Sequence, residues 1–126
     1  MDDKKKVLIV DDEELAQEFL RFFLSKKFDV YTVGSVNTFY NIIGNTTFDL
    51  ILMDISLRDS KDGIQLTQEL KSSERHKNVP VFVLTAFNTT KERNGAAAAG
   101  ADKFITKPVD TKSLIKLIEE TLGACC

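Results

Sequence analysis

VLIVDD, the stretch Val7–Asp12, sets four apolar residues directly before two carboxylates. Leu50–Asp54 (LILMD) repeats the arrangement with one carboxylate, and Val81–Thr85 (VFVLT) ends in a hydroxyl instead. Short runs that are apolar throughout predict strands buried on both faces of a parallel sheet. Because ligands bind at the carboxyl ends of the strands in such a sheet, we expect these polar residues to lie together.

Strand-like runs alternate with longer amphipathic segments along the chain. Two further short runs are Phe104–Thr106 and Val30–Val33, of which the second is more mixed and is expected nearer a sheet edge. The segments expected to be helical are Glu14–Lys26, Ser35–Ile43, Gly63–Ser73, Thr89–Gly100 and Asp110–Gly123. Strands and helices in this alternation predict a doubly wound α/β fold, in which right-handed crossovers place helices on both faces of the sheet.

Local signals mark the faces and ends of these helices. The large apolar residues that fall on one stripe of the first helix are Leu15, Phe19, Phe22 and Phe23. The expected helix starts are Ser35, Thr89 and Asp110, and the expected ends are Gly44, Gly100 and Gly123. Thr89-x-x-Glu92 matches a capping box, in which the two side chains satisfy free backbone N–H groups at the helix start.

The composition is that of an ordinary globular chain. The 126 residues include 43% hydrophobic and 29% charged residues, with a net charge of −2. This length suits one domain over residues 1–126, with a core of about 5–122 and a tail at 123–126. The net charge argues against direct nucleic-acid binding, and no run approaches the roughly 18 apolar residues that span a membrane. We therefore expect a cytoplasmic protein without a membrane partner.

The only two cysteines, Cys125 and Cys126, are adjacent at the C-terminal end. They cannot form a disulfide framework, and with His76 as the only histidine they supply too few ligands for a typical zinc site. We expect a flexible tail here. A lipidated tail, a metal-binding tail and the mark of a cut from a longer protein stay open as alternatives.

Asp11, Asp12 and Asp54 together pose a problem of charge. Two aspartates after a strand are commonly a solvated turn, but three carboxylates at one sheet edge repel strongly at close range. Mg²⁺ is the natural counter-ion, because it takes carboxylate oxygens, keeps several waters and shares phosphate oxygens. Considered alone, a threonine at a strand end such as Thr85 most often has a structural role, and a lysine in a loop such as Lys107 is most often solvated. Beside a metal-bound phosphoryl group, the hydroxyl would donate a hydrogen bond and the ammonium would act as a clamp.

Four motifs resemble the receiver domain of two-component response regulators, a family of phosphoacceptor signalling domains. The motifs are Val7–Glu13, Asp49–Asp54, Val81–Ala86 and Gly100–Pro108. Each is weak alone, but they recur in the family's order and the resemblance covers the chain from about Lys5 to Leu122. It implies a flavodoxin-like sheet of five parallel strands in the order 2-1-3-4-5.

The resemblance also implies roles at the acidic cluster. Asp54 is expected to take a phosphoryl group from a sensor histidine kinase or a histidine phosphotransfer protein, forming an acyl phosphate. Asp12 is expected to bind Mg²⁺ directly, Asp11 mainly through water, and Ser56 through its backbone carbonyl. Mn²⁺ is the expected substitute for Mg²⁺.

Thr85 and Lys107 are expected to hold the phosphoryl oxygens, where positioning and charge do most of the catalytic work. In the family a switch couples this threonine to an aromatic residue on the last strand, here Phe104; plain packing of that ring is the alternative. The Lys107–Pro108 peptide is expected to be cis. The face from Thr89 to Leu122 is expected to signal to a downstream partner, to a lost output domain, or to a second copy in a homodimer.

The loop after Asp54 departs from the family pattern. Arg58 stands where a proline is common, and Gly63 comes about one residue late, after Leu57–Asp62. Because Ser56 precedes the irregular part, we expect the chemistry to survive. Because of the extra charged residues, kinase recognition and the rigidity of this loop are where we expect a difference from the family.

Phe87, two residues after Thr85, flanks the site. In the family this position and that of Ser56 tune hydrolysis of the acyl phosphate. We hypothesise that the Phe87 ring shields the phosphoryl group from water and slows its loss.

Two other functions stay open beside the phosphoacceptor switch, which is not an enzyme. A Mg²⁺-dependent phosphohydrolase with an aspartyl nucleophile would use the same residue types. Its Asp-x-Asp-x-Thr pattern is missing, because Ile55 and Ser56 follow Asp54. A scaffold that signals by binding alone usually lacks a residue of the site, and none is lost here.

Overall fold

The computed structural model describes residues 4–87 and 89–123. Its strands are β1 (Lys6–Val10), β2 (Asp29–Val33), β3 (Leu50–Asp54), β4 (Val81–Thr85) and β5 (Lys103–Thr106). Its helices are α1 (Glu14–Leu24), α2 (Val36–Asn45), α3 (Gly63–Ser72), α4 (Thr90–Ala99) and α5 (Thr111–Leu122). All strand pairs are parallel and the sheet order is β2-β1-β3-β4-β5, which confirms the predicted doubly wound fold. The prediction for Cys125 and Cys126 lies outside the described residues.

Burial explains why the central strands are apolar. Every residue of β3 and β4 is buried, as are four of the five residues of β1. β2 and β5 form the two sheet edges and are mostly half-exposed, which confirms that Val30–Val33 lies at an edge. Each large apolar side chain that is fully buried stabilises the fold by roughly 1.5–3 kcal/mol.

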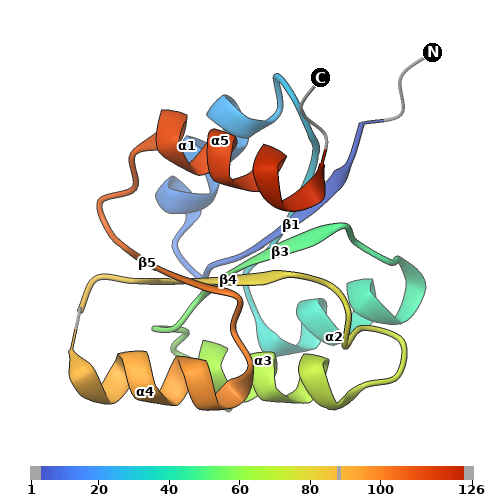
Figure 1. Cartoon of the computed structure of the whole chain (residues 1–126). Helices are drawn as coiled ribbons and strands as arrows, with labels where there is room; N and C mark the ends of the chain where they lie inside the picture. Colours follow the sequence, from blue (N-terminus) through green and yellow to red (C-terminus); the bar gives the residue numbers. More distant parts are fainter. Residues whose placement is uncertain (1–3, 88, 124–126) are drawn as a thin grey trace.

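Two helical layers enclose the sheet, with α1 and α5 on one face and α2, α3 and α4 on the other (Figure 1). The helix residues of the first core include Leu20, Leu24, Leu114 and Ile118. The helix residues of the second core include Phe39, Leu66, Leu70 and Ala96. Alternate strand residues supply the two cores, since Val7 and Ile9 join the first and Leu8 and Val10 the second.

The apolar stripe of α1 does not pack on the sheet, although such a stripe usually faces the core. Leu15 is 87% exposed, Phe19 49% and Phe22 63%. The residues of α1 that are buried are Leu20 and Leu24, on another side of the helix. Helical periodicity finds apolar faces but does not say which one meets the sheet, so α1 presents large apolar side chains to solvent.

Helix α2 confirms its predicted start but not its predicted end. Ser35 caps the helix in a reciprocal capping box with Thr38. The helix continues through Gly44 to Asn45. A glycine inside a helix costs only about 1 kcal/mol relative to alanine, so Gly44 weakens the last turn without ending it.

The other helix ends follow the sequence signals more closely. Gly100 and Gly123 end α4 and α5 with φ angles of 97° and 63°, the left-handed region that favours glycine. Asp110 stands at the N-cap of α5, but its carboxylate accepts a hydrogen bond from the Ser113 hydroxyl at 2.8 Å. None of the helices in residues 4–87 and 89–123 has the length and apolar character needed to cross a membrane.

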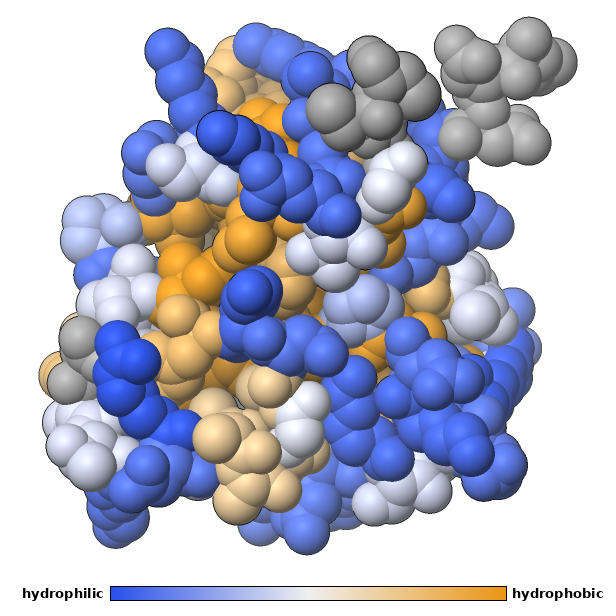
Figure 2. Space-filling model, viewed as in Figure 1, coloured by the Kyte–Doolittle hydropathy of each residue, from blue (hydrophilic) through white to orange (hydrophobic). Residues whose placement is uncertain are grey.

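The surface seen from the β5 edge is largely hydrophilic, with apolar residues exposed between α4 and α5 (Figure 2). A shallow groove of about 270 Å³ lies on this side. Its apolar lining comes from Ile105, Val109, Leu114 and Leu117. The last strand and the last helix thus offer an apolar strip within a polar rim.

Candidate functional site

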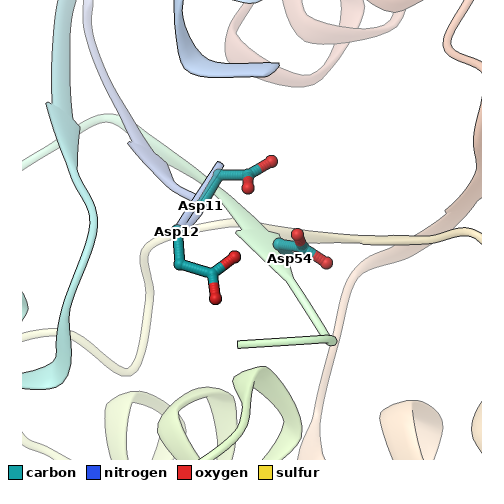
Figure 3. Close-up of side chains that lie close together, drawn as sticks. All are labelled: Asp11, Asp12 and Asp54. Carbon is teal, nitrogen blue, oxygen red and sulfur yellow. The ribbon is translucent and has the colours of Figure 1, made fainter. Parts of the chain in front are cut away.

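Three carboxylates meet at the carboxyl edge of the sheet. Asp11 and Asp12 follow β1 directly, and Asp54 is the last residue of β3. Val10 pairs with Met53 in the register of these two strands, so the aspartates that follow are neighbours. One oxygen from each carboxylate lies within 4.8 Å of the others, and the side chains lie close together at the ends of the two strands (Figure 3).

Lys107 enters this cluster from the loop after β5. Its Nζ lies 3.2 Å from Asp54 Oδ2 and 3.4 Å from Asp11 Oδ2. The Lys107 N–H donates to the Thr85 carbonyl at 2.7 Å, which fixes the backbone beside β4. The Lys107–Pro108 peptide is cis. One ammonium therefore bridges two carboxylates that are almost fully buried, with 1% and 3% of Asp11 and Asp54 exposed.

Burial and charge change the acidity of the cluster. Burial raises the pKa of Asp11 to about 6, and the neighbouring Asp54 carboxylate adds to the rise. The hydrogen bond from the Glu13 N–H and the charge of Lys107 act against it. For Lys107, burial lowers the pKa, but Asp54 and Asp11 outweigh burial and hold it above its ordinary 10.5. One ammonium does not fully balance the carboxylates around it.

The donor set fits a small divalent cation. Mg²⁺ takes oxygens at 2.0–2.1 Å in an octahedral shell and typically uses one or two carboxylates together with waters. Backbone N–H groups orient the carboxylates here: the Glu13 N–H donates to Asp11 Oδ1 and the Ser56 N–H to Asp54 Oδ1, both at 2.9 Å. The opposite oxygens, Asp11 Oδ2 and Asp54 Oδ2, face the positive charge of Lys107. The carboxylates are thus arranged around a point where positive charge is favourable.

Arg58 also reaches the cluster, through Asp12. Its backbone N–H donates to Asp12 Oδ2 at 3.0 Å and its Nε to the same oxygen at 3.3 Å. The Arg58 side chain is 79% exposed. In the sequence Arg58 is a departure from the family pattern, but no local signal there indicates its contact with a carboxylate of the site.

The lengthened loop is tied to its surroundings at several points. Asp59 Oδ2 accepts from the Val36 N–H at the start of α2 at 2.9 Å. Asp62 caps α3 in a reciprocal capping box with Gln65. Gly63 then packs so closely that a Cβ at this position would lie 2.2 Å from the Asp54 carbonyl oxygen. The loop is held by its caps and by this contact, in which Gly63 packs against the main chain of Asp54 and Ile55.

Thr85 is fully buried at the end of β4, but its hydroxyl is engaged on the α4 side. Thr85 Oγ1 lies 2.7 Å from Glu92 Oε1 and 3.1 Å from the Phe87 carbonyl oxygen, and it accepts from the Phe87 N–H at 2.9 Å. Phe104 is half-buried on β5, with the guanidinium of Arg93 4.8 Å from its ring centroid. The predicted capping-box residue Glu92 therefore binds Thr85.

A cleft of about 440 Å³ opens onto the cluster. It is lined by Asp12, Glu13, Asp54, Ser56, Arg58, Ala86, Phe87 and Lys107. Phe87 stands at this cleft with 62% of its surface exposed. The structure thus gathers most of the predicted site residues around one opening, while the Thr85 hydroxyl faces Glu92.

Fold and site together define a flavodoxin-like α/β protein with a lysine-paired acidic cleft, and comparison with known proteins gives its family. Residues 7–119 match the family described as the response regulator receiver domain. The chain is 35% identical over 120 residues to the response regulator protein PilR of Pseudomonas aeruginosa. That match covers 94% of this chain but only 26% of PilR, so the chain spans about a quarter of the length of this relative.

Solved structures agree. The receiver domain of a sensor histidine kinase from Pseudomonas aeruginosa, described with a magnesium ion coordinated in its active-site cleft, is 25% identical with a TM-score of 0.86. That match covers 95% of this chain and 98% of the other. A CheY-like receiver domain protein from Methanospirillum hungatei is 25% identical with a TM-score of 0.87, covering 96% and 95% of the two chains. The chain belongs to the response regulator receiver domain family, whose members are phosphoacceptor signalling switches.

Proposed function

We propose that Asp54 is the phosphoacceptor of this receiver domain. The observation that carries the proposal is the nearly buried Asp54 carboxylate, which shares Lys107 with Asp11 at the floor of an open cleft. A donor phosphorus entering this cleft would meet the carboxylate oxygen in line with its leaving group. The new oxygen–phosphorus bond makes an acyl phosphate as the bond to the donor breaks.

The divalent cation of this reaction is Mg²⁺, with Mn²⁺ as a substitute. Asp11, Asp12 and Asp54 would hold it through carboxylate oxygens or bound water, and the Ser56 backbone carbonyl is the further ligand we propose. Bound there, the ion neutralises the crowded carboxylates and the incoming phosphoryl oxygens. The 4.8 Å grouping of carboxylate oxygens supports this ligand set.

The chain's own residues supply positioning. Lys107, already 3.2 Å from Asp54, would hold a phosphoryl oxygen as a point charge. Thr85 would hold a second oxygen once its hydroxyl turns toward the cleft. Ser56 and Phe87, both at the cleft, would set how readily water reaches the acyl phosphate. Phosphorylation leaves Asp54 covalently modified, whereas an enzyme regains its starting state after each turnover. We therefore describe this domain as a switch that assists its own phosphorylation and dephosphorylation, and not as an enzyme.

The phosphodonor is a sensor histidine kinase or a histidine phosphotransfer protein. Its histidine must approach over the sheet edge that carries Lys107. The exposed apolar stripe of α1 adjoins that edge, since Phe19 lines a cleft of about 220 Å³ together with Lys107 and Pro108. An apolar helix face on the donor protein would fit this surface while presenting its histidine to Asp54.

The output is a change at Thr85 and Phe104 that is passed to the face from Thr89 to Leu122. The apolar strip on this face in Figure 2 supports contact with another protein. We propose a downstream protein, an output domain or a second copy of this chain as its partner, without direct nucleic-acid binding or membrane contact. A cytoplasmic location fits a donor of this class.

Incubation with a small phosphodonor and Mg²⁺ tests the acceptor. The intact mass of wild type should increase by one phosphoryl group, while Asp54→Ala should not change. Asp29→Asn, which alters an exposed aspartate on β2, is the matched control and should behave as wild type. An unchanged wild-type mass under conditions that preserve acyl phosphates would favour a binding scaffold. Turnover of phosphate esters would favour a phosphohydrolase.

A further inference from the structure

The hydroxyl of Thr85 has only one proton to donate, and the structure gives it two acceptors on the α4 side. Glu92 Oε1 lies at 2.7 Å and the Phe87 carbonyl oxygen at 3.1 Å. A carboxylate is the stronger acceptor, because charge-assisted hydrogen bonds are shorter and stronger than neutral ones. Thr85 is fully buried, so water does not compete for this proton.

We propose that Glu92 is a positioning residue that holds the Thr85 hydroxyl away from the acceptor site and so stabilises the resting state of the switch. The inference rests on the proposed function, in which Thr85 must donate to a phosphoryl oxygen. The same proton cannot serve both acceptors at once. Phosphorylation therefore has to break the Thr85–Glu92 hydrogen bond, and the strength of that bond sets how much of the domain is active.

Glu92 is itself held in place. Its backbone N–H donates to Thr89 Oγ1 at 3.1 Å at the start of α4. Its carboxylate lies in the first turn, where the helix dipole favours negative charge. The side chain is half-buried, so the carboxylate is presented to Thr85 by a capped helix end rather than by a freely moving surface residue.

The next residue ties the same helical turn to the second switch residue. Arg93 places its guanidinium 4.8 Å from the centroid of the Phe104 ring. Glu92 and Arg93 are consecutive, so the first turn of α4 contacts both Thr85 and Phe104. A displacement of this turn that releases Thr85 would alter the surroundings of Phe104 at the same time, which gives the proposed switch a physical coupling.

Binding of beryllofluoride, a phosphoryl mimic, in the presence of Mg²⁺ tests this role. Glu92→Ala should bind the mimic about three- to tenfold more tightly than wild type, since the competing hydrogen bond is gone. Glu92→Gln, which keeps a neutral acceptor of the same shape, should fall between the two. The affinity for Mg²⁺ alone should be unchanged in both variants, because Glu92 does not touch the carboxylate cluster.

Asn94→Gly is the matched control. It weakens α4 at an exposed position but leaves the Thr89 cap and the Glu92 carboxylate, so the mimic should bind it as it binds wild type. Equal tightening in Asn94→Gly and Glu92→Ala would mean that loosening of α4 is responsible and would overturn the proposal. Equal or weaker binding by both Glu92 variants would also overturn it, while leaving Asp54 as the acceptor. If wild type neither binds the mimic nor becomes phosphorylated, the proposed function itself fails, and with it the role given to Thr85.

Discussion

Two regions of the site are held together in different ways. One is the proposed acceptor end, formed by Asp11, Asp54 and Lys107. The other is the α4 side, formed by β5, α4 and the segment before α4 that carries Phe87. At the acceptor end, Asp11 follows β1 and Asp54 is the last residue of β3, and their carboxylates share the Lys107 ammonium. Both strands are buried on both faces. On the α4 side, the four residues of β5 are half-buried or exposed, and the buried residues of α4 are Ala96 and Ala99. Small side chains bury little apolar area, so moving α4 costs less free energy than moving a core strand. The residues proposed for the chemistry are thus already close together, while the side proposed to respond is held by a few exchangeable contacts.

The largest expected effect is the loss of stability at the acceptor end when Gly63 is replaced. In Gly63→Ala the new Cβ would lie 2.2 Å from the Asp54 carbonyl oxygen, and both are backbone-fixed. We expect the free energy of unfolding to fall by about 3 kcal/mol, at the upper end of overpacking costs, with loss of phosphorylation. Urea denaturation measures the first effect and intact mass the second.

Gly44→Ala is the control for this substitution. A Cβ at Gly44 meets nothing within 4 Å, and the residue lies inside helix α2. Alanine there should raise stability by up to about 1 kcal/mol. A stable, phosphorylatable Gly63→Ala would show that the loop after Asp54 yields more easily than the packing indicates.

The next effect is the pH dependence that Asp11 gives to the acceptor end. In the unfolded chain Asp11 titrates near 3.8, and burial raises its pKa to about 6 in the folded state. Between these values the folded state binds the extra proton, so metal-free protein should lose stability as the pH rises through this window. At about 1.4 kcal/mol per pKa unit the loss is up to about 3 kcal/mol.

Denaturation of wild type and Asp11→Asn at several pH values, with a chelator present, measures this dependence. Burial lowers the pKa of His76, which by itself makes stability rise with pH near its ordinary 6.5, but both proteins share that contribution. The raised pKa of Lys107 matters only above its ordinary 10.5. A difference between the two proteins that stays constant with pH would contradict a raised pKa at Asp11.

A smaller effect is expected at Phe87, on the α4 side. Phe87→Ala should lose its phosphoryl group severalfold faster than wild type, because the ring no longer covers the cleft. Phe22→Ala removes a ring of similar exposure, 63% against 62%, from helix α1 and is the control. Decay of the phosphorylated mass with time gives the rate, and equal rates in wild type and Phe87→Ala would exclude shielding.

The smallest expected effect is on the affinity for Mg²⁺, through the contact of Arg58 with Asp12. Arg58→Ala removes a guanidinium that competes with a cation for Asp12 Oδ2, while the backbone N–H bond stays. The affinity for Mg²⁺ should rise by about two- to fivefold, the range expected for an exposed ion pair. Titration calorimetry measures it. Arg75→Ala makes the same change in net charge at a residue bonded to the Gly44 carbonyl, and it should leave the affinity unaltered.

Much of this molecule could be predicted from sequence because short apolar runs define the buried strands. A polar residue directly after such a run must lie at the carboxyl edge, and this predicts that Asp11, Asp12 and Asp54 are neighbours. Periodicity does not give the order of the strands, which only the resemblance to the family implies. Both kinds of inference concern the backbone, which the pattern of burial specifies well.

Contacts that depend on side-chain rotamers were beyond the sequence. Thr89-x-x-Glu92 predicted a capping box, and Thr89 does cap α4, yet the Glu92 carboxylate binds Thr85. The contact of Arg58 with Asp12 crosses between two loops and has no local signature. In α1, apolar residues lie on more than one side, so the pattern could not say that Leu20 and Leu24 face the sheet.

The ion pair between Lys107 and Asp54 joins residues 53 positions apart, and this order along the chain has a consequence for biosynthesis. A chain that emerges from the ribosome presents its aspartates well before the lysine that balances them, and a domain folds as a unit, here with Leu114 and Ile118 of α5 in its core. Until Lys107 arrives, the carboxylates have no ammonium beside them. We expect divalent cations to matter most when this lysine is missing, so refolding of the full-length Lys107→Ala chain should depend on Mg²⁺ more strongly than refolding of wild type.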